Sequence, residues 1–195
     1  MGTQHIAEMW STTFPQVITH EKVLVDCEAE RDQFLETMDI LGEKLGPLVL
    51  QFPFFDRWRL PKQRDFLAVL GPFLKKVPAD RKLAIEIRNR TWLDAVLADL
   101  LREHKVALVL RDLSSMPRPW EFKEKFDFVT ADFAYVRWLG DRKGIEEQTT
   151  TWDKTVVDRR SDLMNWVELF RQFVSRNLKL FAYTNNHTQE MVRER

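Results

Sequence analysis

The sequence predicts an α/β protein of the (β/α) barrel type, and three observations lead to this fold class. Short apolar runs rich in β-branched and aromatic residues recur along the chain, and helical patterns lie between them. Such alternation forms a parallel sheet, either open and doubly wound or closed into a barrel. No GxGxxG or GxxxxGKS/T phosphate loop follows any of the apolar runs. This disfavours the nucleotide-binding open sheet, so the barrel is the preferred architecture.

Five apolar runs are expected to be strands buried on both faces of the sheet. They span residues 47–52, 83–87, 106–110, 134–138 and 179–184, and a partial strand is expected at 14–18. Apolar residues at a period near 3.6 predict helices over residues 28–44, 62–75, 92–104 and 161–177. Gly46 and Pro47 are expected to end the first of these helices, and Thr91 to cap the third.

Composition narrows the class of protein. A chain of 195 residues with 44% hydrophobic content predicts one globular domain over residues 1–195. Thirty Lys and Arg residues balance thirty Asp and Glu residues, which disfavours a nucleic-acid partner. Cys27 is the only cysteine, which indicates a reducing compartment and a cytoplasmic location. No apolar run approaches the roughly 20 residues that span a bilayer, so no membrane partner is expected.

Polar side chains lie at the carboxyl end of nearly every expected strand. They are Gln51, Glu86, Arg88, Asp112, Arg137, Asn185, Asn186 and His187. Parallel α/β folds bind ligands at this end of the sheet, and in barrels this rim collects catalytic groups from several strands. Glu86 and Arg88 are two residues apart on one strand and should therefore project to the same side. The pattern predicts a small-molecule site.

Roles follow from residue chemistry. Glu86 is the candidate for proton transfer, with Asp112 and His20 assisting it as further catalytic candidates. The substrate-binding candidates are Arg88 and Arg137 for the anionic part of the ligand, with Gln51, Asn185, Asn186 and His187. As alternatives, Glu86 and Arg88 form only a structural ion pair, and Asp112 is a helix cap or turn residue. His20 and His187 lie in no tight ligand spacing, so no metal site is predicted, and the cofactor is left open.

Six segments resemble the YecE-like family, also called domain of unknown function 72. In order from Phe14 to His187 they read VITHEKVL, LGEKLGPLVLQFP, LAIEIRNRTW, HKVALVLRD, DFAYVRWLG and LFAYTNNH. The resemblance implies a (β/α) barrel with a polar cleft at the strand ends and no settled reaction. Family members usually begin with two further strands, which residues 1–13 do not resemble. A barrel needs about eight strands, so we expect a partial barrel that lacks its first two strands.

The resulting hypothesis is a protein that binds a small polar or anionic metabolite at the carboxyl ends of the strands, with Glu-based acid/base chemistry there; whether it is an enzyme is left open. The alternative is a truncated, non-catalytic relic or an interaction protein of the same family. Self-association through the open barrel edges is expected in either case, because unpaired strand edges favour pairing with another copy.

Overall fold

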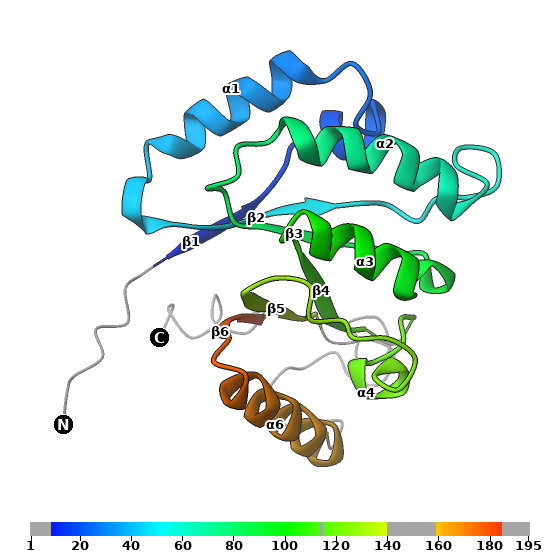
Figure 1. Ribbon diagram of the computed structural model, residues 1–195, viewed down its shortest axis with the longest axis vertical. Helices are drawn as coiled ribbons and strands as arrows, with labels where there is room; N and C mark the ends of the chain where they lie inside the picture. The colour runs from blue at the N-terminus through cyan, green and yellow to red at the C-terminus, as the bar shows by residue number, and fades with distance from the viewer. Residues whose placement is uncertain (1–8, 114, 140–158, 185–195) are drawn as a thin grey trace, which may run out of the picture.

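The computed structural model describes residues 9–113, 115–139 and 159–184. These residues form a six-stranded parallel half-barrel sheet flanked by helices (Figure 1). The strands are paired in sequence order and are β1 (Trp10–Thr13), β2 (Leu45–Gln51), β3 (Leu83–Glu86), β4 (Ala107–Asp112), β5 (Phe133–Trp138) and β6 (Lys179–Thr184). The α/β class is confirmed, whereas a TIM-barrel-like architecture and its missing strands stay predictions.

Helices connect the strands along the outer side of the curved sheet (Figure 1). They are α1 (Glu28–Asp39), α2 (Gln63–Lys76), α3 (Ala95–Glu103), α4 (Pro119–Phe122) and α6 (Arg160–Ser175), with the short turns η1 (Val17–Glu21), η2 (Gly42–Lys44) and η3 (Arg90–Trp92). Two helix boundaries differ from expectation. The first helix ends at Asp39, and Gly46 and Pro47 lie inside β2. The cap of α3 is Asp94 rather than Thr91, since its side chain accepts from the Leu97 N–H at 3.0 Å.

The first strand also lies earlier than the sequence pattern placed it. Residues 10–13 form β1, which pairs with β2, and the expected strand at 14–18 gives way to the η1 turn. Pro15 carries no N–H and so cannot continue the ladder. The last backbone hydrogen bond from this segment to β2 is donated by the Phe14 N–H to the Val49 carbonyl, at 2.9 Å. β1 thus lies within residues 1–13, where the sequence pattern predicted no strand.

Alternate residues of each strand divide the core between the two faces of the sheet. On the outer face, Leu50, Ile85 and Val136 belong to the large apolar cluster that includes the helices. On the inner, concave face, Val49, Ala84, Ala107, Val109, Phe133, Tyr135 and Phe181 form a second cluster. This division determines which polar side chains at the strand ends turn inward.

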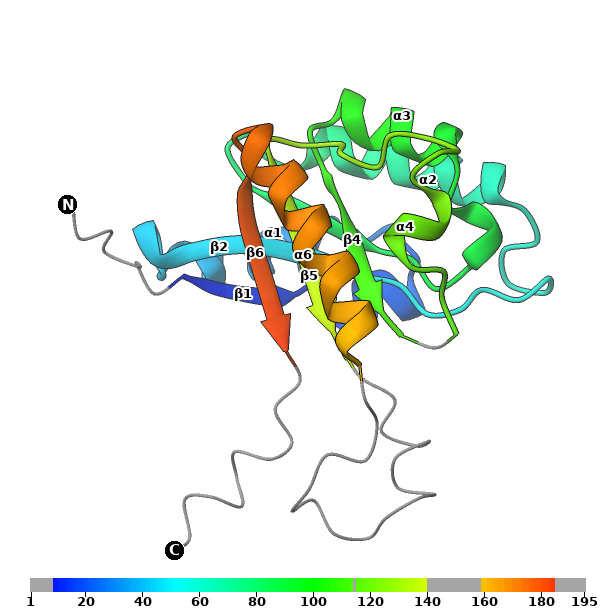
Figure 2. The same ribbon diagram turned by 90° about the horizontal axis from the view of Figure 1, so that it is seen from below.

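The sheet curls enough for side chains to meet across its concave face. The Ser11 hydroxyl in β1 lies 2.8 Å from the Tyr135 hydroxyl in β5, although three strands, β2 to β4, separate the two in the order of the sheet. Figure 2 shows β4, β5 and β6 running side by side in one direction. Burial, the largest cause, raises the pKa of Tyr135 to about 12.

In the part of the chain described, no helix is long and apolar enough to cross a membrane.

Candidate functional site

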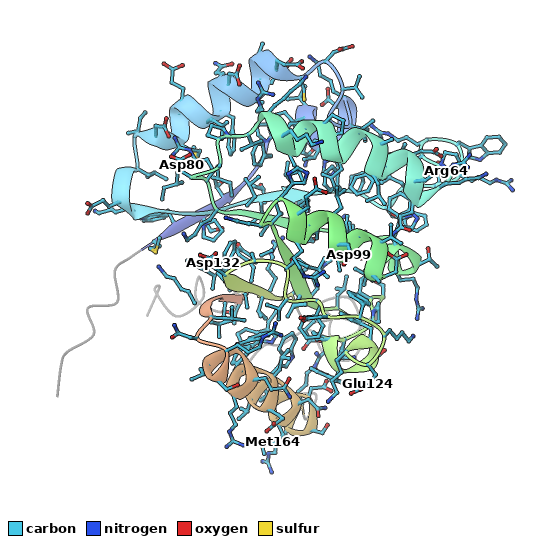
Figure 3. All side chains as sticks on the ribbon, viewed as in Figure 1. Arg64, Asp80, Asp99, Glu124, Asp132 and Met164 are labelled. Carbon is cyan, nitrogen blue, oxygen red and sulfur yellow. The ribbon has the colours of Figure 1, made fainter. Side chains whose placement is uncertain are left out.

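The inner face of the sheet becomes polar at its carboxyl end. Two residues beyond Val49, Ala84, Val109 and Tyr135, the strands place Gln51, Glu86, Arg111 and Arg137. Because the period of a strand is two, these four side chains continue the inner face. In the register of the sheet, Gln51 pairs with Glu86 on the neighbouring strand, and Arg111 pairs with Arg137. The opposite end of the sheet is marked in Figure 3 by Asp80 and Asp132, which precede β3 and β5.

Glu86 is the centre of this group. Its side chain is 0% exposed, and one carboxylate oxygen accepts a hydrogen bond from Arg137. The other oxygen, Oε1, lies 3.3 Å from Arg111 Nη1 and 4.0 Å from Arg88 Nε. Arg137 also donates to Gln51 Oε1 at 2.9 Å. One buried carboxylate therefore faces three guanidinium groups, and four of the residues singled out in the sequence meet here: Gln51, Glu86, Arg88 and Arg137.

Arg111 is incompletely partnered. Its side chain is only 5% exposed, and its Nε and Nη1 have no hydrogen-bond acceptor within the described residues, although Nη1 is close to Glu86. Burial is the largest cause that lowers the pKa of the Arg111 guanidinium; Glu86 raises it, and Arg88 and Arg137 lower it again. Arginine nevertheless remains a cation in proteins. Buried donors without acceptors are costly, so this guanidinium has capacity for an additional anionic partner.

An open pocket of about 540 Å³ lies directly beside this guanidinium. We call it the arginine pocket; its lining residues are Phe54, Arg88, Arg90, Arg111, Leu113, Ser115 and Met116. They come from the segments that follow β2 and β3 and from the end of β4 with its following loop. The lining contains three arginines and no acidic residue among those described. Its volume lies in the range usual for small-molecule sites.

Asn89 fixes one wall of the arginine pocket. Its side-chain oxygen accepts from the Phe55 N–H at 2.9 Å, and its side-chain nitrogen donates to the Phe55 carbonyl at 2.8 Å. Both bonds are buried. Asn89 thus holds the loop after β2 against the segment that carries Arg88 and Arg90. It satisfies two backbone groups that would otherwise be unpaired in the protein interior.

Asp112 lies on the other face of β4, away from the Glu86 group. Its carboxylate accepts from Arg159 Nη1 at 3.1 and 3.2 Å and lies 3.1 Å from Arg118. Arg118 also contacts Asp162 in α6 at 3.2 Å. This differs from the expectation that Asp112 shares a cleft with Glu86, because alternation along β4 turns Arg111 inward and its neighbour outward. Asp112 instead connects the end of β4 to the start of α6.

His20 lies in η1, the turn that follows β1, and is within electrostatic reach of Arg88. Its Nδ1 is 2.9 Å from the Thr19 hydroxyl, and either atom can be the donor. Burial is the main cause that lowers the pKa of His20, and the charges of Arg88 and Arg59 lower it further, against a smaller opposite effect of Glu21. The imidazole is therefore held in its neutral form to lower pH than a free histidine.

This shift predicts a pH dependence of stability. A histidine whose pKa is lower in the folded than in the unfolded state binds protons preferentially when unfolded, so stability falls as the pH drops below about 6.5. We expect His20→Gln to lose less stability than the wild type between pH 7.5 and pH 5.5. Urea unfolding at both pH values measures this difference. Equal losses in the two proteins would show that His20 does not contribute.

Three candidates fall outside the part of the chain that the structure describes, and four residues at the site were not predicted from the sequence. Asn185, Asn186 and His187 lie outside the described residues. Arg111, Asn89, Arg90 and Phe54 were not predicted to belong to the site. Arg111 could have been found from strand periodicity, because it follows Val109 by two residues and therefore shares the face of β4 that turns inward. Within residues 9–113, 115–139 and 159–184, no three His, Cys, Asp or Glu side chains are grouped as a metal site would require.

Comparison with known proteins gives two matches. A family model described as "Protein of unknown function DUF72" matches residues 9–192. The crystal structure of a DUF72 family protein from Thermotoga maritima is similar in fold, with a TM-score of 0.66 and 21% sequence identity over 95% of this chain and 74% of that one. At this identity the likeness concerns the fold alone. No curated protein matches the sequence significantly.

Proposed function

The chain belongs to the DUF72 family of proteins of unknown function, and we propose that it binds a small anionic molecule in the arginine pocket. A single observation carries this proposal. Arg111 is a buried guanidinium with unsatisfied donors, and it lines a pocket together with two further arginines. Arginine recognises carboxylates and phosphates through paired, charge-assisted hydrogen bonds. An anion in the pocket would supply the acceptors that the described residues do not.

Glu86 supports this site as a positioning residue. Both of its oxygens face guanidinium groups, those of Arg137 on one side and of Arg111 and Arg88 on the other. A general base must present an oxygen to the substrate, and this carboxylate is fully enclosed. The geometry therefore favours a role in orienting the arginines over proton transfer by Glu86. Acid/base chemistry remains the alternative that the Glu86→Gln variant below separates from it.

The same proposal includes the architecture that carries the site. We infer that the half-barrel is part of one (β/α) barrel domain over residues 1–195, with the arginine pocket on its carboxyl-terminal rim. Ligand binding at this rim is the general rule for barrels. A built pocket with a buried, unsatisfied cation favours a binding protein over a relic whose site has decayed. Self-association through the strand edges stays a prediction.

Titration with inorganic phosphate tests the proposal. We expect phosphate to bind the wild type, and Arg111→Met to weaken that binding at least about tenfold, since a hydrogen bond to a charged group contributes roughly 1.5–3 kcal/mol. Isothermal titration calorimetry at constant ionic strength measures the affinity. Glu86 keeps Arg137 as its partner in this variant, so the protein should stay folded, which circular dichroism verifies.

Arg171→Gln is the matched control, because it removes the same charge from an exposed position in α6 that pairs only with Glu168 among the contacts described. We expect it to leave phosphate affinity unchanged. Arg90→Gln removes a second, exposed arginine of the pocket and should weaken binding by several-fold. If both pocket variants bind phosphate as the wild type does, or if the wild type binds none, the proposed function is wrong.

A further inference from the structure

The loop after β2 presents an aromatic ring to the arginine pocket. Three phenylalanines follow this strand within four residues: Phe52 and Phe55 are buried, whereas Phe54 is 66% exposed and lines the pocket. Exposed single aromatic residues are common on protein surfaces. What distinguishes Phe54 is that it lines the same pocket as three arginines, where the other apolar lining residues are Leu113 and Met116.

The position of Phe54 is fixed by its neighbours. Phe55 is held on both backbone groups by Asn89, and its ring stacks on Trp92 at a centroid distance of 5.9 Å and an interplanar angle of 22°. Phe52 packs edge-on against Phe66 at 4.9 Å. With the residues on either side of the Pro53–Phe54 pair buried in the core, the ring of Phe54 is directed outward before any ligand binds. A preorganised contact costs little ordering entropy on binding.

We propose that the ligand of the arginine pocket is a small phosphate monoester that carries a planar aromatic group, with the phosphate on Arg88, Arg90 and Arg111 and the ring against Phe54. This inference rests on the proposed function and specifies the ligand class of the same site. The pocket of about 540 Å³ has room for both parts of such a molecule.

Charge selects a phosphate over a carboxylate. Four arginines, three lining the pocket and Arg137 behind Glu86, are matched by the single Glu86 carboxylate, which leaves a marked excess of positive charge. A phosphate monoester carries about −1.5 to −2 at pH 7 and offers three terminal oxygens as acceptors. A monocarboxylate offers one charge and two oxygens. The phosphate therefore satisfies more of the arginine donors.

Three probes separate the two parts of the ligand: inorganic phosphate, phenyl phosphate and benzoate. We expect phenyl phosphate to bind about tenfold more tightly than inorganic phosphate, because an aromatic contact of good geometry contributes roughly that factor. Benzoate keeps the ring but carries only one charge and two acceptor oxygens, so it should bind less tightly than phenyl phosphate. Isothermal titration calorimetry at one pH and ionic strength gives all three affinities.

Phe54→Ala should abolish the preference for phenyl phosphate by lowering phenyl phosphate affinity more than inorganic phosphate affinity, whereas Phe54→Tyr should retain the preference. Trp58→Ala is the matched control, since Trp58 is 81% exposed in the same loop and does not line the pocket. If phosphate binds but phenyl phosphate binds no better, or if Phe54→Ala keeps the preference, the aromatic assignment is overturned while the proposed function stands. Benzoate binding as tight as phenyl phosphate overturns the phosphate assignment. If no phosphate probe binds in an Arg111-dependent way, both proposals fail.

Discussion

Replacing Glu86 by glutamine is expected to lower the free energy of unfolding by about 3 kcal/mol or more. Glutamine keeps the shape of the side chain but removes its charge. Arg111 and Arg137 would then face each other at the end of the sheet with no carboxylate between them. Removing one partner of a buried ion pair typically costs 3–5 kcal/mol, because the remaining charge is left uncompensated.

Urea unfolding followed by circular dichroism measures this loss. Glu168→Gln is the matched control: Glu168 pairs with Arg171 on the exposed surface of α6, and such a pair contributes less than about 1 kcal/mol. Glu86→Gln is also expected to weaken phosphate binding, because the arginines lose the group that orients them. A variant as stable as the wild type that had lost only turnover of a substrate would identify Glu86 as an acid/base group and contradict the positioning role.

Much of this arrangement follows from periodicity in the sequence. The continuous apolar runs predicted the strands β2 to β6. The polar residues near the ends of these runs indicated a common rim of a parallel sheet. Gln51, Glu86, Arg88 and Arg137 meet there because parallel strands place their carboxyl ends at the same edge. These residues were predictable because their positions depend on strand direction and period alone.

The errors concern choices that a one-dimensional pattern does not decide. Asp112 was expected to share a cleft with Glu86 as a polar residue at a strand end, yet the face of a strand depends on where its alternation begins, and Arg111 takes the inward position. The position of β1 depended on its pairing with β2, which brings residues 10–13 into the sheet despite their weak apolar pattern. Asn89 binds a loop 34 residues away in sequence, a contact that local sequence does not show.

Replacing Asn89 is expected to change both the stability of the fold and the selectivity for the proposed ligand. We expect Asn89→Ala to lower the free energy of unfolding by about 2 to 4 kcal/mol. The Phe55 N–H and carbonyl would each lose a buried partner, and an unsatisfied buried group costs roughly 1–3 kcal/mol. Asn89→Asp keeps an acceptor for the N–H but places a buried carboxylate against the Phe55 carbonyl oxygen, so its loss should be at least as large as that of Asn89→Ala. Asn165→Ala, at an exposed position of α6, should change stability little.

A purely structural Asn89 would affect stability alone, whereas a residue that positions Phe54 also affects ligand selectivity. In folded Asn89→Ala, the preference for phenyl phosphate over inorganic phosphate is expected to fall toward the value of Phe54→Ala, because the loop after β2 is released from the segment that carries Arg88 and Arg90. Inorganic phosphate affinity should change less, since Arg111 remains in β4. Calorimetric titration of both probes, at a temperature where the variant is folded, gives this ratio. A destabilised variant with the full wild-type preference would show that Phe54 keeps its place without Asn89.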